Sequence, residues 1–406
     1  MALCLANSLV ARRDYVPYDQ LVRYKWWYRH GYMSSVGHCF DIGSATKHAL
    51  AKFENRQEEF AEEHKIPLDQ LDYLSDSKLL NKFNVHCGAE GAAGNGALMR
   101  LAPVPLFFYQ HPTKAVEFSG HSGLITHGDR KAYDACRYYG ALIMSALHGE
   151  DKEQMLDEDF YSKHEKWFNN KPLHAKILEV AKGSYKKDGY DQGIRGNGYI
   201  VDTLKAALWA FWSDNGDFEK GVLAVVNLGD DTDTTAAIYG QLAGAYYGYE
   251  KLPKKWVEQV YAKTLISGLS KWMVYEGSKW LPEESATSTI SSVIVESASR
   301  DGNQSSFERA RCSSAQPWTK QDQKFGPNSS AEKLDATSNL SSKFEQLNSH
   351  NAGHRSRQNN LLQPDPLVRS TSNRRSTSSH PKPPQHDDLT SVSKRKSSKF
   401  LTDNIE

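Results

Sequence analysis

The sequence predicts an all-α domain of many helices over residues 1–284, followed by a disordered tail over residues 285–406. Two observations predict this division. Before Pro282, aliphatic and aromatic residues recur at helical spacing, without the period-2 alternation that is typical of half-buried strands. After Pro282 the chain is rich in Ser, Asn, Gln and Pro, and such a composition cannot bury enough apolar surface to offset the entropy of ordering.

Each predicted helix depends on a stretch with one apolar stripe. Residues 18–32 place Leu21, Tyr24, Trp27 and Tyr28 on one face of a helix. The same spacing predicts helices within residues 1–15, 129–149 and 198–212, and residues 232–248 are expected to form a helix of small residues. In the last of these, Gly240, Gly244 and Gly248 recur every four residues beside Ala236 and Ala237, so we expect another helix to approach that face closely.

Composition excludes several classes of partner. The formal net charge of +1 offers no whole-chain argument for specific nucleic-acid binding, and no apolar run is long enough to span a membrane. Five cysteines without a CxxC pair suggest neither a disulfide framework nor a zinc site. We therefore expect a cytoplasmic monomer. The basic patch at Ser393–Lys399 could direct nuclear entry, although a solvated charge run is the more ordinary interpretation.

An acidic cluster lies in residues 227–248, NLGDDTDTTAAIYGQLAGAYYG, where three aspartates precede the predicted helix. Carboxylates this close repel one another and need a compensating positive charge at the edge of a core. Asp231, Asp233 and Thr234 carry the oxygen ligands that Mg²⁺ prefers. Helix capping is the alternative, but a single acidic cap would suffice for it. The cluster therefore favours a metal site.

Two further stretches contain candidate ligand-binding residues. In HCGAEGAAGNGALMRLAPVPL, residues 86–106, glycines allow close backbone approach, Asn95 can donate and accept, and Arg100 offers a fork for phosphate. In SGLITHGD, Thr126, His127 and Asp129 follow one another closely. Each signal alone is weak, because a glycine-rich turn or a single histidine is more often structural.

These stretches occur together in one known family, the all-helical ADP-ribosylglycohydrolases, which the chain resembles from Met1 to about Leu281. The resemblance rests on GHCFDIGSATKHAL, AAGNGALMRLAPVPL, THGDRKAYDAC, GNGYIVDTLKAALWAF and VNLGDDTDTTAAIYGQLAGAYYG. Of these, the last is highly specific. The resemblance implies a Mg²⁺-dependent hydrolase that removes ADP-ribose from protein side chains, with ADP-ribosylated proteins or ADP-ribose as partners.

The resemblance also implies roles for particular residues. Asp231, Asp233 and Thr234 would supply about half of the protein ligands of two Mg²⁺ ions. Asp41 corresponds to an acidic residue facing the ribose, and Asp41 and Asp233 are the candidate catalytic carboxylates. The resemblance implies further residues that contact the substrate: Gly94, Asn95, Gly96, Met99, His127, Gly198 and Tyr199. Of these, His127, Gly198 and Tyr199 would lie on the adenosine side of the ligand.

The implied reaction is hydrolysis of the bond from ribose C1″ to the modified side chain. Mg²⁺ would stabilise developing charge and orient the attacking water, and a carboxylate would assist proton transfer. We expect arginine-linked ADP-ribose slightly ahead of the serine-linked form as the substrate.

The start of the chain departs from the family pattern. Members carry a helix with GDALG-like residues and a Thr-Asp-Asp-Thr motif before the segment that MALCLANSL matches. We therefore expect residues 1–284 to be an N-terminally incomplete domain with a partial metal shell and weak turnover. Two alternatives stay open: an inactive ADP-ribose-binding relative, and a haloacid-dehalogenase-type phosphatase, in which GVLAVVNLGDDTDTT would form a strand and its Asp-x-Asp-x-Thr nucleophile.

Overall fold

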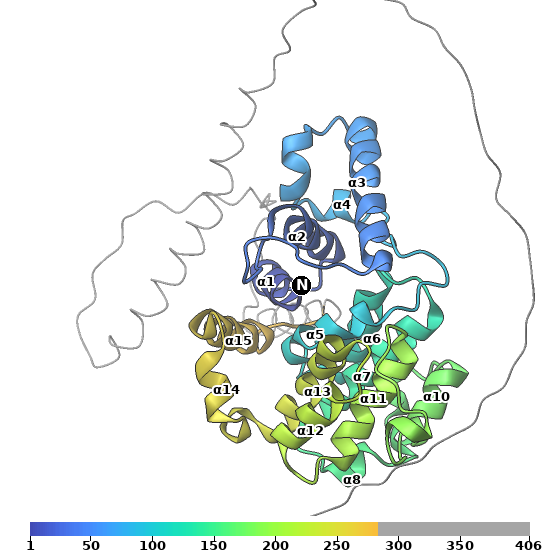
Figure 1. The fold of residues 1–406 in the computed structure, drawn as a ribbon. Coiled ribbons are helices and arrows are strands. Elements are labelled where there is room, and N and C mark those ends of the chain that lie inside the picture. Colours follow the sequence, from blue (N-terminus) through green and yellow to red (C-terminus); the bar gives the residue numbers. More distant parts are fainter. Residues whose placement is uncertain (283–406) are drawn as a thin grey trace, which may run out of the picture. The chain divides into compact units, whose positions relative to one another are not determined.

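The structure, a computed structural model, describes residues 1–282, which form an assembly of α-helices and short 3₁₀-helices (Figure 1). Within this range there is no β-strand, only two isolated bridges, which pair Ala89 with His127 and Gly94 with Tyr199. The prediction of an all-α domain is therefore confirmed. No helix in this part of the chain has both the length and the apolar character that a membrane span requires. The predicted tail and its basic patch lie outside the described residues.

Fifteen α-helices and five 3₁₀-helices follow one another within residues 1–282. The first eight α-helices are α1 (Ala2–Arg12), α2 (Pro17–His30), α3 (Ser44–His64), α4 (Ser77–Leu80), α5 (Pro103–Phe107), α6 (Pro112–Leu124), α7 (Arg130–Leu147) and α8 (Lys152–Met155). The others are α9 (Phe160–Lys163), α10 (Ala175–Ala181), α11 (Ile200–Ser213), α12 (Phe218–Val226), α13 (Thr232–Tyr247), α14 (Lys254–Gln259) and α15 (Lys263–Gly277). The 3₁₀-helices are η1 (Leu68–Tyr73), η2 (Asn95–Arg100), η3 (Glu165–Phe168), η4 (Tyr190–Gln192) and η5 (Tyr249–Lys251).

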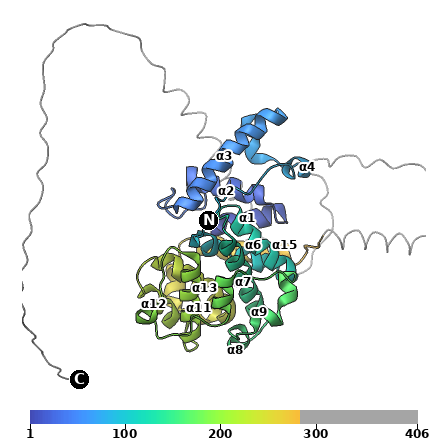
Figure 2. The same ribbon diagram turned by 90° about the vertical axis from the view of Figure 1, so that its right-hand side faces the viewer.

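Helix α7 occupies the centre of the hydrophobic core. Thirteen of its residues between Ala132 and Ser145 are buried, on every face of the helix. A helix that is buried on every face must be covered on all sides, and its buried Asp134 and Arg137 form an ion pair with each other. Helices α6, α11 and α13 pack against it, and α7, α11 and α13 lie side by side in both views (Figures 1 and 2). The core therefore supports the two helices, α11 and α13, whose first residues carry predicted site motifs.

The N-terminal helices pack around a second part of the same core. Every residue from Cys4 to Leu9 in α1 is buried, and α1 contacts α2, α5 and α15. Helix α2 buries Leu21 and Tyr24 of its predicted stripe, while Trp27 and Tyr28 are half-buried. The spacing of apolar residues therefore identified both helices.

Local chemistry sets where α2 begins and ends. Pro17 occupies the first helical positions, where its missing N–H is not needed. Gly31 ends the helix with φ of 67°, and a Cβ there would lie 2.1 Å from the Gly37 carbonyl oxygen. Only glycine meets both demands, so the turn that leads from α2 toward α3 depends on it.

Two predictions need correction in this part of the chain. The apolar run Gly221–Val226 belongs to helix α12 rather than to a strand, which removes the structural basis of the phosphatase alternative. The small-residue face of α13 is also less closely covered than predicted. A Cβ at Gly244 would meet no atom within 4 Å, and one at Gly240 would meet only Phe218 Cζ at 4.0 Å. Small side chains permitted close helix packing there but did not require it.

Candidate active site

Helix α13 begins at the acidic motif. Gly229 and Asp230 adopt φ of 77° and 58°, which turns the chain sharply between α12 and α13. The backbone N–H of Asp231 donates to the Gly196 carbonyl at 2.8 Å, and Thr235 Oγ1 donates to the Asp231 carbonyl at 2.7 Å. The main chain thus anchors Asp231 and leaves its carboxylate available for other partners.

The carboxyl groups of Asp231 and Asp233 influence each other's protonation. Burial raises the pKa of Asp231, but hydrogen bonds from Asn95, Thr234 and Asp233 outweigh burial and lower it. The pKa of Asp233 is raised, first by its hydrogen bond to Asp231 and then by burial. Two acids this close favour one shared proton, or a cation in its place.

Asp231 occupies the N-cap position of α13, yet the capping interpretation does not account for the motif. The Thr234 N–H, which an N-cap side chain commonly accepts, donates at 2.8 Å to Asp233 Oδ1. Asp233 is exposed, and Thr234 is buried with its hydroxyl 3.9 Å from Met99 Sδ. Two carboxylates and a hydroxyl therefore gather at one helix start.

Asn95 joins the acidic motif to a glycine segment, here defined as residues 94–100. Its Nδ2 donates to Asp231 Oδ2 at 2.7 Å, and further to Thr203 Oγ1 at 3.2 Å and the Asn197 carbonyl at 3.4 Å. The side chain is only 8% exposed. The amide donors of Asn95 point to protein partners around Asp231, and the expected contact of Asn95 with the substrate stays a prediction.

Two Gly-Asn-Gly triplets face one another beside the motif. The first is Gly94–Gly96 and the second is Gly196–Gly198. The backbone N–H of Asn95 donates to the Gly198 carbonyl at 3.1 Å, and Gly94 pairs with Tyr199 in an isolated antiparallel bridge. Sequence reasoning named Gly198 as a substrate contact but missed that the second triplet pairs with the first, although the repeated triplet was a signal that could have found it.

His127 lies against the glycine segment. A Cβ added at Gly94 would be 3.3 Å from His127 Nε2, and one added at Gly96 would be 3.4 Å from His127 Cε1. Thr126 Oγ1 lies 2.8 Å from His127 Nδ1. Burial, followed by the charge of Arg100, lowers the pKa of His127 to about 3. The imidazole is therefore neutral at physiological pH.

Arg100 completes this buried network. It is 1% exposed and donates to the Gly96 carbonyl at 2.8 Å, the Ser122 carbonyl at 3.0 Å and Thr126 Oγ1 at 2.6 Å. Because Thr126 accepts from Arg100, its own proton can point to His127 Nδ1, which places the imidazole proton on Nε2 beside the glycine segment. No carboxylate in residues 1–282 forms an ion pair with Arg100. The sequence offered Arg100 only as a weak candidate for phosphate binding, and its burial and protein acceptors give it a structural role here.

The remaining predicted substrate residues lie at the edge of this arrangement. Met99 is 38% exposed and touches Thr234, while Tyr199 is half-buried at the N-cap of α11. A Cβ at Gly198 would meet no atom within 4 Å. Met99 and Gly198 are therefore accessible to a ligand, whereas Tyr199 is only partly so.

Asp41 stands apart from the acidic motif. It is exposed on the loop before α3, and its Oδ1 accepts the Ile42 N–H at 2.8 Å. Among the described contacts, none joins Asp41 to Asp231 or Asp233. The first turn of α3 still approaches the glycine segment, since a Cβ at Gly96 would lie 3.4 Å from Thr46 Oγ1.

The acidic motif fits Mg²⁺ in the kind of ligand that it offers. Asp231, Asp233 and Thr234 supply only oxygen atoms, and Mg²⁺ commonly keeps water or substrate in its other octahedral positions. Within residues 1–282 there is no cluster of three or more His, Cys, Asp or Glu side chains that could hold a metal ion. The motif can therefore account for part of a coordination shell.

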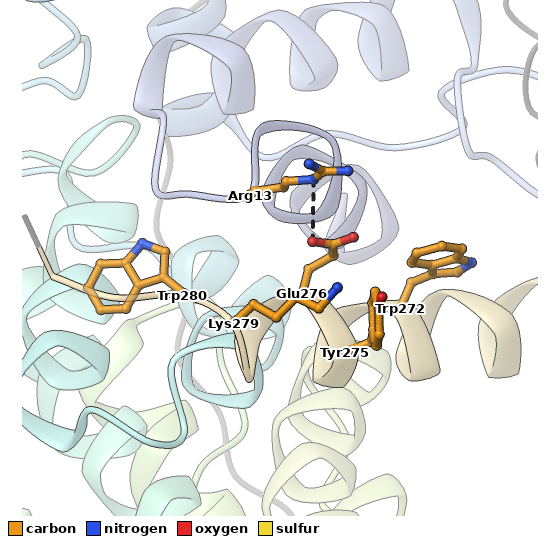
Figure 3. A pocket seen from close by; sticks show the side chains of 6 residues that line it. All are labelled: Arg13, Trp272, Tyr275, Glu276, Lys279 and Trp280. Carbon is orange, nitrogen blue, oxygen red and sulfur yellow. Dashed lines mark ion pairs between the residues drawn. The ribbon is translucent and has the colours of Figure 1, made fainter. Parts of the chain in front are cut away.

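A cavity of about 340 Å³ lies elsewhere, beside α15. Figure 3 shows an ion pair of Arg13 with Glu276, at 3.3 Å, between Trp280 on one side and Trp272 and Tyr275 on the other. Its lining residues are Arg13, Trp272, Tyr275, Glu276, Lys279 and Trp280. None of these residues belongs to the predicted motifs. We therefore place the candidate active site at the motifs and not at this cavity.

Comparison with known proteins agrees with these motifs. The sequence profile of the ADP-ribosylglycohydrolase family matches residues 1–283. Two relatives are named ADP-ribosylarginine hydrolase Tri1. The one from Serratia proteamaculans (strain 568) is 32% identical over 68% of this chain and 65% of its own length, and the one from Pseudomonas putida (strain GB-1) is 37% identical over 64% and 60%.

A solved structure also matches, an ADP-ribosylglycohydrolase-related protein complex. It shows 33% sequence identity and a TM-score of 0.51, over 68% of this chain and 79% of the solved chain. The chain thus spans less than two thirds of the length of the two named relatives. Because the profile covers the whole helical part, the chain belongs to the ADP-ribosylglycohydrolase family.

Proposed function

We propose that this protein hydrolyses the bond between ribose C1″ of ADP-ribose and the side chain of a modified protein. Two relatives carry the name ADP-ribosylarginine hydrolase, which supports arginine-linked ADP-ribose as the first substrate. Serine-linked ADP-ribose is the alternative linkage. The partners would be ADP-ribosylated proteins, and ADP-ribose would be the released product.

The observation that carries the proposal is the hydrogen bond of 2.7 Å from Asn95 to Asp231. It joins the glycine segment to the acidic motif across 136 positions of sequence. The glycine segment, whose backbone a ligand can approach closely, therefore lies beside ionisable carboxylates. Recognition and bond cleavage need these two properties in one place.

Positive ends of helices support binding of a diphosphate. The starts of η2 and α11 meet where Gly94 pairs with Tyr199, and the start of α13 joins them through the Asp231 bond to Gly196. The helix dipole favours anions at such ends, where the N–H groups of Asn95, Tyr199 and Asp231 already have protein acceptors. The neutral Nε2–H of His127, beside Gly94, would add a donor without adding a charge.

The carboxylates would manage the proton in the reaction. Water adds to C1″, the bond from C1″ to the side-chain nitrogen or oxygen breaks, and that atom leaves with a proton. Exposed Asp233 would accept the proton of the attacking water. Asp41, on its exposed loop, would face the ribose as the second carboxylate.

Asp231, Asp233 and Thr234 would hold Mg²⁺. When bound there, Mg²⁺ supplies Lewis-acid stabilisation of the negative charge that develops during cleavage. The hydrogen bond from Asn95 would keep Asp231 turned toward that position.

A direct assay of linkage tests the proposal. The full chain is incubated with two synthetic peptides, which carry ADP-ribose on arginine or on serine, with Mg²⁺ or with a chelator. Released ADP-ribose is measured by mass spectrometry, and ADP-ribose affinity is measured by calorimetry. We expect release from the arginine peptide, with loss of release in the chelator.

The assay distinguishes the alternatives. Release from the serine peptide alone would replace the proposed linkage. Binding of ADP-ribose without release from either peptide would replace hydrolysis with the inactive-binder alternative. Undiminished release in the chelator would contradict the role of Mg²⁺.

A further inference from the structure

We infer that Gln241 is a positioning residue that holds the glycine segment in register with the acidic motif. Gln241 lies on α13, two helical turns beyond Thr234, and no motif singled it out. The inference deepens the proposed function, because it concerns the geometry of the same site. Its structural part also stands without that function.

One side-chain amide serves three backbone groups at the end of η2. Gln241 Oε1 accepts the Ala102 N–H at 2.7 Å, while Nε2 donates to the carbonyls of Leu98 at 3.2 Å and Met99 at 3.1 Å. Helix ends commonly need partners from outside the helix, and here the Leu98 carbonyl also accepts the Leu101 N–H at 3.1 Å. Gln241 adds three contacts at the end of η2 from a neighbouring helix, and its amide can donate and accept there at once.

This contact is one of three that align the glycine segment along α13. Asn95 bonds Asp231 at the start of the helix, Met99 touches Thr234, and Gln241 holds the segment end. Thr234 and Gln241 are seven residues apart and share a helix face. Without Gln241, only the contacts of Asn95 and Met99 would join the segment to α13, while Arg100 and the Asn95 N–H would still join it to other elements.

The surrounding face of α13 offers little else to hold the segment. Its nearby residues include Ala237, Gly240 and Gly244, which have no polar side chains, and Gly244 borders open space. Packing on small side chains does not select one axial position, whereas three directional hydrogen bonds do. The position of Met99 and Asn95 relative to Asp231 therefore depends on Gln241.

Two substitutions test this inference in the full chain. Gln241→Glu keeps the shape and the acceptor for Ala102 but removes every donation from Nε2, including the one to the Ala237 carbonyl of its own helix at 3.2 Å, and opposes the η2 carbonyls. Gln241→Met keeps the approximate volume and removes every hydrogen bond of the side chain. Gln259→Glu is the matched control, because Gln259 is exposed at the end of α14.

A second control separates positioning from general loss of stability. Tyr239 lies on α13, as Gln241 does. Tyr239→Phe removes the hydrogen bonds from its hydroxyl to Asp214 and to the Phe218 carbonyl, away from η2. We measure hydrogen exchange of residues 93–102, the thermal midpoint, and the Kd for ADP-ribose. Both Gln241 variants should lose exchange protection in residues 93–102 and bind ADP-ribose about tenfold more weakly.

The controls should keep the wild-type affinity, with Tyr239→Phe lowering only the thermal midpoint. Unchanged exchange of residues 93–102 in both Gln241 variants would overturn the inference, whether or not the wild type binds ADP-ribose. Faster exchange with unchanged affinity would also overturn it, because the register would then not matter to the site. If the wild type binds no ADP-ribose, the proposed function fails, and the exchange measurement alone decides the role of Gln241.

Discussion

The candidate site has a buried half and an open half, and they treat charge in opposite ways. In the buried half, Arg100, Thr126 and His127 satisfy one another by hydrogen bonds, and His127 is kept neutral. In the open half, Asp231 and Asp233 crowd two acids at one helix start. The buried half stabilises the fold, whereas the open half retains unfavourable charge that a ligand can compensate.

This difference separates the effects of substitution. Loss of a buried hydrogen-bonded group destabilises the protein, because its former partners remain buried. Loss of an open carboxylate relieves repulsion and should affect chemistry rather than folding. Substitutions in the two halves should therefore change different measurements.

The largest effect should come from Asp231→Ala. Loss of this carboxylate removes a proposed Mg²⁺ ligand and the partner of Asn95, so release of ADP-ribose should fall by about a hundredfold or more. The thermal midpoint should fall less than in Arg100→Met, because the buried Asn95 amide loses Asp231 but keeps Thr203 as an acceptor. Peptide assays with Mg²⁺ measure the rate, with Asp191→Ala as an exposed control. Full activity in Asp231→Ala would refute the metal assignment.

Arg100→Met should show the opposite pattern, with a large loss of stability. The variant leaves two carbonyls and the Thr126 hydroxyl without their buried donor, and the free energy of unfolding should fall by about 3 kcal/mol. Urea unfolding measures this change. Arg29→Met, which breaks an exposed ion pair with Glu54, should lower the free energy of unfolding by less than about 1 kcal/mol. Equal losses in the two variants would contradict a special role for the buried half.

His127 should make the fold sensitive to acid. Its pKa is about 3 in the folded chain and near 6.5 when unfolded, so below pH 6.5 the unfolded chain binds a proton that the folded chain does not. The free energy of unfolding should therefore fall as pH falls, by up to about 1.4 kcal/mol per pH unit from pH 6.5 toward pH 3.

Unfolding of the wild type and of His127→Asn at several pH values between 7 and 4 measures this contribution. The variant should be less stable at pH 7, since it loses contacts, but should lose less stability on acidification. Parallel curves for the two proteins would show that His127 is not the group responsible.

The smallest effect should come from Asp230→Gly, in the turn before the motif. Asp230 has φ of 58°, which glycine adopts without the clash of a Cβ, and its side chain is exposed. The substitution should stabilise the protein by about 0.5 kcal/mol, since relief of strain exceeds the added freedom of the unfolded chain. Thermal unfolding measures this gain, and destabilisation would show that the Asp230 side chain has a structural partner.

Much of the fold was predictable because helices are encoded locally. Apolar spacing identified α1, α2, α7, α11 and α13, since one turn of helix brings residues three and four apart onto one face. Apolar spacing did not assign the run in α12 to either a helix or a strand. The wrong strand assignment came from the comparison with a phosphatase whose nucleophile follows a strand. An apolar run of that length is compatible with both structures.

The candidate site was predictable in composition but not in its connections. The acidic motif was evident because clustered aspartates are unfavourable without a ligand. The partner of Asp231 was not, because Asn95 is 136 residues away and its amide could equally have faced a substrate. Gln241 was missed for the same reason, as a single amide in a small-residue helix carries no local signal.

By itself, the sequence determined which residues form helices, where glycines permit sharp turns, and which carboxylates and hydroxyls are available to a ligand. These properties depend on each residue and its near neighbours along the chain. Tertiary structure alone decided that Asn95 holds Asp231, that Arg100 is buried, that His127 is neutral, and that Gln241 secures η2. Hydrogen-bond partners and burial depend on which distant segments pack together, and no local pattern specifies that.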